Sequence, residues 1–232
     1  MPKSEAAEQE DWAAHLARQE ARYRDGEARL SPDAPAGGAD ADAYQRQLTR
    51  LGNAAGGAGL SLLMLGRREQ AAEWFARAAE RYRESFRQAP PGSWGRPIGA
   101  IKALVLAGNW AGAEDAARWA LETNPGEADS PIGRYTAALA LLVLGRDDEA
   151  RVQADAVRTQ DDFPSDVGDA LAFLAAQDVM GYTTAIEAVL ESFERREEYL
   201  EDLPVADTVL VLQALAERRH MRVELSSPLL PY

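Results

Sequence analysis

Apolar residues recur at helical spacing along most of this chain, and short polar or glycine-containing breaks separate the apolar segments. Alanine, leucine, arginine and glutamate dominate, and long runs of β-branched residues are absent. This composition favours helix almost everywhere. A first helix is expected over residues 6–24. The segment 25–42 contains Ser31-Pro32-Asp33-Ala34-Pro35-Ala36-Gly37-Gly38, which predicts a loop or linker between an N-terminal arm and the body of the protein.

A repeat follows from residue 43 onward. Four glycines, each preceded by an apolar residue, mark the expected ends of helices at spacings of 42, 37 and 36 residues: Gly66, Gly108, Gly145 and Gly181. The positions five, nine and twelve residues after each glycine are all apolar and lie on one helical face. They are Ala71, Phe75 and Ala78; Ala113, Ala117 and Ala120; Ala150, Ala154 and Val157; and Ile186, Leu190 and Phe193. The many alanines predict antiparallel helices that approach closely.

This pattern resembles the tetratricopeptide repeat over residues 43–203, with Pro125 and Pro164 near the expected ends of two units. Its spacing is longer than the roughly 34 residues of that family, and the leading aromatic positions are poorly filled. The resemblance implies an all-α fold, a tetratricopeptide-like α-solenoid of antiparallel helix pairs. We therefore expect an N-terminal helix and linker over 1–42 and a helical-repeat domain over 43–232.

The end of the chain differs from the repeats. A final helix is predicted from Pro204 to Arg219, and it is apolar on nearly all sides, which is typical of a buried helix. The C-terminal tail, the N-terminal arm or a second subunit must therefore cover it, so self-association through this helix is one alternative. Residues 221–225 alternate apolar and polar side chains, which predicts a short extended tail packed on the body.

Charge narrows the choice of partners. The 232 residues carry a net charge of −13, and residues 147–207 contain 17 acidic residues against 4 arginines. An excess of acid disfavours binding to nucleic-acid phosphates and to anionic lipid. The acidic stretch has two readings: solvated helix faces that keep the protein dissolved, or a surface that steers a basic protein partner. A third reading is that an acid-rich surface with few lysines suits a cytoplasm of high salt.

Candidate chemistry is sparse. The chain has no cysteine and only two histidines, His15 and His220, so thiolate chemistry is excluded and an imidazole pair is not expected. The glycine-rich segment 52–59 lacks the preceding strand and the spacing of a nucleotide loop, so we interpret it as a helix with a small face. Asp161, Asp162 and Asp166 lack the glycine and spacing of a calcium loop. We expect no cofactor, no metal and no enzymatic activity.

Loop aromatics and acidic residues are the candidates for partner binding. Trp and Tyr often anchor protein interfaces, although a loop aromatic can also simply pack on its own loop. The predicted partner-binding set is Trp94, Trp110, Tyr135, Asp161, Asp162, Glu197 and Glu198. The first eleven residues do not look like a signal peptide, and the longest apolar run, 137–144, is shorter than the roughly 20 residues of a membrane span. A soluble cytoplasmic protein is expected.

The last fifty residues carry a second resemblance. An acidic helix around 182–190, a helix over 206–219 and the segment Val223-Glu224-Leu225-Ser226-Ser227-Pro228-Leu229-Leu230-Pro231 are similar to the end of the bacterial Imm49 immunity proteins. That resemblance implies a non-enzymatic protein that binds and neutralises a cognate polymorphic toxin. A basic toxin domain would suit the acidic stretch. The alternatives are a tetratricopeptide-like scaffold that holds a peptide in a concave groove, and an enzyme or enzyme subunit.

Overall fold

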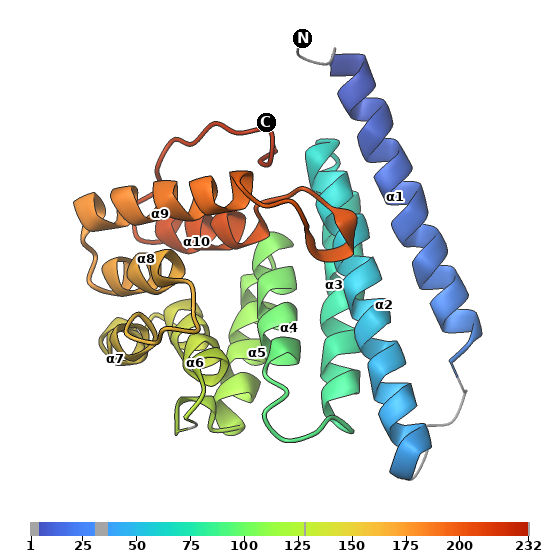
Figure 1. Ribbon diagram of the computed structural model, residues 1–232, viewed down its shortest axis with the longest axis horizontal. Helices are drawn as coiled ribbons and strands as arrows, with labels where there is room; N and C mark the ends of the chain where they lie inside the picture. The colour runs from blue at the N-terminus through green and yellow to red at the C-terminus, as the bar shows by residue number, and fades with distance from the viewer. Residues whose placement is uncertain (1–4, 31–36, 128, 232) are drawn as a thin grey trace. The chain divides into compact units, whose positions relative to one another are not determined.

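The computed structural model describes residues 5–30, 37–127 and 129–231, and these residues are all-helical, without a β-strand among them (Figure 1). The prediction of an all-α chain is confirmed. The helices are α1 (Glu5–Ala28), α2 (Gly38–Met64), α3 (Arg68–Phe86), α4 (Gly95–Leu106), α5 (Trp110–Glu122), α6 (Pro131–Val143), α7 (Asp147–Val157), α8 (Ser165–Ala175), α9 (Val179–Glu194) and α10 (Asp207–Glu217), with the 3₁₀ turns η1 (Pro125–Glu127) and η2 (Leu200–Asp202).

The chain divides into two compact units. Unit 1 contains residues up to Gly108 together with 198–205 and the last residues from Leu230, and unit 2 contains 109–197 and 206–229. In unit 1, α1 packs along α2, α2 packs on α3, and α3 packs on α4. In unit 2, each of α5 to α9 contacts the next helix along the chain, and α10 contacts α8 and α9. This division differs from the expected boundary at residue 42, because α1 is joined to α2 by packing.

The twelve apolar positions of the predicted repeat are all buried, with none more than 6% exposed. Left-handed glycines end three of the helices, since Gly66, Gly108 and Gly145 have φ of 72°, 69° and 69°. At two of these turns the next residue donates a backbone hydrogen bond across the turn, from Arg67 to Leu62 (2.8 Å) and from Arg146 to Leu141 (2.9 Å). Such bonds satisfy carbonyls at the helix end.

The fourth turn is displaced from its predicted position. Gly181 lies inside α9, where its amide donates to the side chain of Asp178 (3.0 Å) at the start of the helix. The left-handed residue that ends the preceding helix is Gln177, with φ of 54°. Asp178 then donates its amide to the Phe173 carbonyl (2.9 Å). The prediction of Gly181 was wrong because it assumed that glycine always fills the left-handed position, whereas here hydrogen bonds hold a glutamine there.

The linker is shorter than expected. Residues 25–28 continue α1, and residues 38–42 already belong to α2. Between them, residues 29, 30 and 37 are described as non-helical, and residues 31–36 lie outside the described residues. Asp25 to Ala28 contain no proline, so nothing interrupts the helix before Arg29. No helix in the described part of the chain is long and apolar enough to cross a bilayer.

The glycine-rich segment forms the packing face of α2. A Cβ on Gly59 would lie 2.6 Å from the Phe75 ring, and one on Gly52 would lie 2.8 Å from the Tyr82 ring. The two aromatic rings of α3 therefore lie directly on the backbone of α2, which any larger residue would prevent. Between them, Gly56 faces open space, with no heavy atom within 4 Å of a Cβ placed there.

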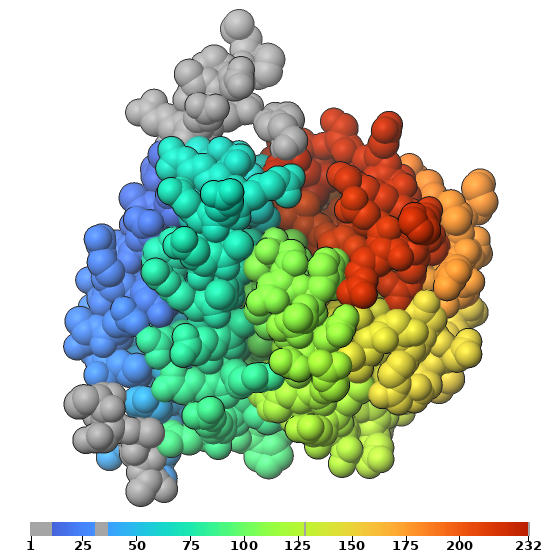
Figure 2. Space-filling view, turned by 180° about the vertical axis from the view of Figure 1, so that it is seen from behind, coloured from blue at the N-terminus to red at the C-terminus, as the bar shows by residue number. Residues whose placement is uncertain are grey.

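The final helix begins later than predicted, at Asp207. Ala206 is its N-cap residue, with a non-helical ψ of 64°, and the Ala206 amide donates to the Leu229 carbonyl (3.0 Å). The C-terminal tail, one of the three segments predicted to cover this helix, packs against it and does not form a strand. Gln213 donates its amide group to the Val223 carbonyl and accepts a hydrogen bond from the Val223 amide (3.2 Å). Ser227 donates to Glu194 of α9 (2.7 Å), and Figure 2 shows the red surface of the last part of the chain, α10 and the tail together, beside the orange surface of α9.

Replacing Gly59 by alanine is expected to lower the free energy of unfolding by about 1–3 kcal/mol, because the added methyl group overlaps the Phe75 ring. Gly56→Ala is the matched control in the same helix. It is expected to raise stability by up to about 1 kcal/mol through helix propensity alone. Urea denaturation measures both, and equal effects of the two variants would contradict close packing at Gly59.

A pH effect is expected from Tyr182, whose hydroxyl donates to Gln213 (3.2 Å) beneath the tail. Burial raises the pKa of this fully buried phenol above its usual 10. The unfolded chain therefore loses the phenolic proton first, so the contribution is intact below pH 10 and stability falls as the pH rises beyond it. Denaturation between pH 9 and 11 should show a shallower fall for Tyr182→Phe. An unchanged slope would contradict the assignment.

Candidate functional site

The predicted partner-binding residues are divided between the two units. Asp161 and Asp162 are exposed in the loop between α7 and α8, and Glu197 is exposed just after α9. These three belong to unit 2, whereas Trp94 and the exposed Glu198 belong to unit 1. Both tryptophans are half-buried: Trp94 directly precedes α4 and Trp110 begins α5.

Tyr135 is a core residue of α6, which corrects its place in that set. Its side chain is 8% exposed, and its ring lies 5.4 Å from the ring of Phe163. Trp110 is also engaged within its own unit, because the Arg218 guanidinium lies over its ring at 4.3 Å. The sequence pattern could not separate these aromatic residues from surface anchors, since burial depends on contacts made by distant segments.

The acidic excess is concentrated in unit 2. Unit 2 carries 21 acidic and 10 basic side chains, a net charge of −11, whereas unit 1 carries 17 and 15, a net charge of −2. Some of the unit 2 carboxylates are paired along their helices, such as Glu149 with Arg146 and Glu191 with Arg195. Others are exposed and have no hydrogen bond or ion pair to any described residue: Asp148, Asp161, Asp162, Glu187 and Glu197.

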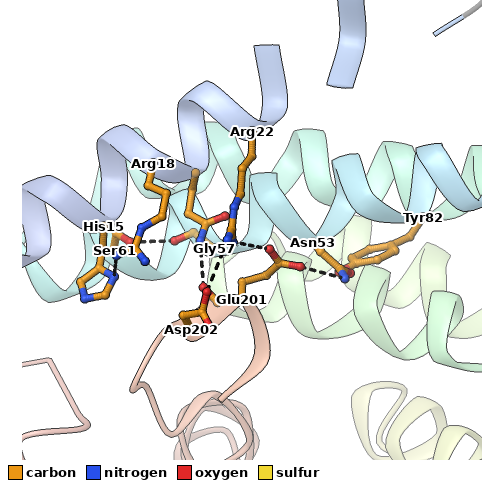
Figure 3. A network of polar contacts seen from close by, with 10 residues as sticks. His15, Arg18, Arg22, Asn53, Gly57, Ser61, Tyr82, Glu201 and Asp202 are labelled. Atoms are coloured by element: carbon orange, nitrogen blue, oxygen red, sulfur yellow. Dashed lines mark hydrogen bonds and ion pairs between the residues drawn. The ribbon is translucent and has the colours of Figure 1, made fainter. Parts of the chain in front are cut away.

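A polar network in unit 1 surrounds η2 (Figure 3). Gln19 of α1, which is fully buried, donates its amide group to the Glu201 backbone carbonyl (3.0 Å). Arg22, one turn further along α1, donates to the carboxylates of Glu201 (2.8 Å) and Asp202 (3.3 Å). The network thus fixes both the backbone and the side chains of η2 against α1.

Helix α2 completes the network from the other side. Asn53 donates to the second carboxylate oxygen of Glu201 (3.3 Å), and the Tyr82 hydroxyl of α3 donates to the Asn53 side chain (2.8 Å). Next to it, Leu203 lies on Gly57 of α2, where a Cβ would come within 2.8 Å of the leucine. Residues from three helices therefore hold a segment that follows them by about 120 or more positions in the sequence, which no local motif can reveal.

The backbone of η2 is strained. Glu201 and Asp202 have φ of 57° and 58°, a left-handed conformation that costs a residue with a side chain about 1 kcal/mol or more. A residue with a side chain keeps this conformation where contacts with its surroundings hold its backbone in place. Here the side chain of Glu201 is largely enclosed, at 21% exposed, whereas that of Asp202 is 71% exposed. Glu201 is therefore the residue through which the network holds the segment.

A pocket of about 450 Å³ adjoins this network between α1 and α2. Charged and polar side chains form its walls: Arg22, Asp25, Arg29, Gln47, Arg50 and Glu201. Its floor is apolar and consists of Leu51 and Ala54, each of which is at most 2% exposed. This pocket was not predicted from the sequence, because its wall residues come from segments that are far apart in the chain.

Neither histidine belongs to a group of this kind. The Arg18 guanidinium donates a hydrogen bond to Nδ1 of His15 (2.8 Å) on α1, and His220 is exposed in the turn after α10. Across the side chains that the structure describes, from residue 11 to 30, 37 to 127 and 129 to 231, no three histidines or carboxylates are grouped as ligands of a metal ion.

Comparison with known proteins found no matching family model, no matching curated protein sequence and no matching solved structure.

Glu201→Ala is expected to lower the free energy of unfolding by about 1–3 kcal/mol, because it leaves Arg22 and Asn53 without their shared acceptor. Asp202→Ala is the matched control: its left-handed backbone is the same, but its exposed side chain makes one longer bond. We expect that variant to stay within about 0.5 kcal/mol of the parent. Equal losses in thermal or urea denaturation would show that backbone strain, and not the network, controls this segment.

Proposed function

We propose that this chain is a non-enzymatic protein-binding module, and that it acts as an immunity protein which neutralises a basic toxin domain. The observation that carries the proposal is the net charge of −11 on unit 2, together with its exposed carboxylates that have no partner among the described residues. The similarity of the C-terminal segment to the Imm49 proteins supports the same assignment.

The physical advantage of such a surface lies in association. Potentials of opposite sign increase the rate of encounter by about 10-fold to 1,000-fold at low salt, and they suppress encounters with acidic proteins. An inhibitor of a lethal enzyme gains from fast capture. Because the carboxylates are exposed, the gain should decrease as salt shortens the screening length to about 8 Å at physiological ionic strength.

The proposal includes the way in which the helices are arranged. We infer a tetratricopeptide-like stack of antiparallel pairs, supported by helices that pack on their neighbours in chain order and by buried small residues at repeated positions. The same features favour the second candidate function, a scaffold that binds a peptide segment. The two functions differ in their partner: a folded toxin domain for the first, and a short linear segment for the second.

Co-expression provides the test. Toxin domains encoded beside this gene are expressed in a sensitive bacterial host with and without the chain, and binding is then measured with the purified pair. Protection of the host, with one-to-one binding whose association rate falls with salt, is the expected result. Failure to protect against any neighbouring gene product would exclude the immunity function, and binding to unfolded segments alone would favour the scaffold.

The acidic surface is tested by charge neutralisation. The triple variant Asp161→Asn, Asp162→Asn and Glu197→Gln is expected to slow association with the basic toxin domain about threefold to tenfold, with little change in dissociation. The matched control removes three exposed carboxylates of unit 1: Glu69→Gln, Glu73→Gln and Glu80→Gln. Stopped-flow binding measures both, and equal rates for the two triple variants would remove unit 2 from the proposed interface.

A further inference from the structure

The pocket between α1 and α2 contains charges that the η2 network does not use. The guanidinium of Arg22 is already paired with Glu201 at 2.8 Å, so these two wall residues neutralise each other. The side chains of Arg29, Arg50 and Asp25 have no hydrogen bond or ion pair to any described residue. The uncommitted charges are therefore two guanidiniums against one carboxylate, a net charge of +1 at the pocket.

The remaining polar walls are satisfied. Gln47 donates its amide group to the Gly26 carbonyl (3.1 Å) in the last turn of α1. This bond also covers part of the negative end of the helix, which would otherwise disfavour an anion at this wall. Below the charged rim, Leu51 and Ala54 form an apolar floor. The pocket thus combines a cationic rim, one hydrogen-bond acceptor and a small hydrocarbon surface.

We propose that this pocket binds a small organic carboxylate that carries a hydrogen-bond donor next to its carboxylate group. A guanidinium presents paired N–H donors that match the two oxygens of a carboxylate, so Arg29 and Arg50 supply the anion contacts. Asp25 selects a ligand with a neighbouring hydroxyl or amine, which donates to it, and it repels a simple anion. A single net positive charge suits a carboxylate better than a phosphate dianion.

The size of the pocket agrees with this class of ligand. Its volume of about 450 Å³ falls within the 300–1,000 Å³ range of small-molecule sites. The apolar floor leaves room for a hydrocarbon group beside the carboxylate. All of its lining residues belong to unit 1, so the proposal does not rest on the acidic residues of unit 2 or on the proposed toxin partner.

Titration with two matched probes tests the proposal in the full-length chain. Mandelate carries a hydroxyl beside its carboxylate, and phenylacetate lacks that hydroxyl. Followed by NMR, mandelate is expected to shift the side-chain N–H signals of Arg29 and Arg50 with saturation, and to bind at least threefold more tightly than phenylacetate. The Asp25→Ala variant should bring the two affinities within about twofold, because the acceptor and the repulsion both disappear.

The control is a pair of variants with equal loss of charge. Arg29→Gln with Arg50→Gln should weaken mandelate binding at least tenfold, whereas Arg67→Gln with Arg68→Gln, on the exposed start of α3, should leave it unchanged. All four arginines are exposed, so the variants are expected to fold, which circular dichroism checks. Shifts that do not saturate, or equal binding by the two double variants, would overturn the proposal.

A third arm distinguishes the source of the carboxylate. A short peptide with a free C-terminal carboxylate is compared with the same peptide in amidated form. Binding of the free peptide without binding of mandelate would show that the pocket recognises a chain terminus, and the small-acid proposal would then be wrong. Binding of mandelate with no difference between the peptides would support it.

Discussion

The close approach of helices along rows of alanine and glycine is the constraint on which this structure depends. At Gly52 and Gly59 the rings of Tyr82 and Phe75 lie on bare backbone, and in unit 2 the alanines of α5 and α7 that face their neighbours are fully buried. Small side chains lose little conformational entropy on burial and allow backbones to approach. The same positions tolerate few substitutions, because a close-packed interior has no space for an added methyl group.

This constraint explains why sequence predicted the body of the protein well. The positions five, nine and twelve residues after a turn repeat because each helix must present its small face to the next one, so the pattern is local and readable. The displacement of the fourth turn shows the limit of that reading. Glycine favours the left-handed conformation, but Gln177 adopts it when the Schellman-type bond from Asp178 and the cap on Gly181 are both present.

The polar site could not be predicted in the same way. In the sequence, Gln19, Arg22 and Asn53 look like ordinary residues on helix surfaces. Their shared role depends on contacts to Glu201, which lies about 150 or more positions later in the chain. Long-range pairing of this kind has no period and no motif. The same reason accounts for Tyr135, whose burial depends on Phe163 in a later loop. Sequence therefore identified the repeating packing faces, while the sites made by non-local contacts had to be found in the structure.

The segregation of charge bears on how a partner would be held. Exposed carboxylates increase the rate of encounter, but they contribute little to the lifetime of a complex, because solvent screens them and rim pairs are weak. A tight complex also needs buried apolar anchors. Unit 2 exposes large apolar side chains besides its acids, among them Val152 at 66% and Met180 at 78%. In the proposed complex the acidic residues thus account for fast and selective capture, and the stability of the bound state must come from apolar contacts of this kind.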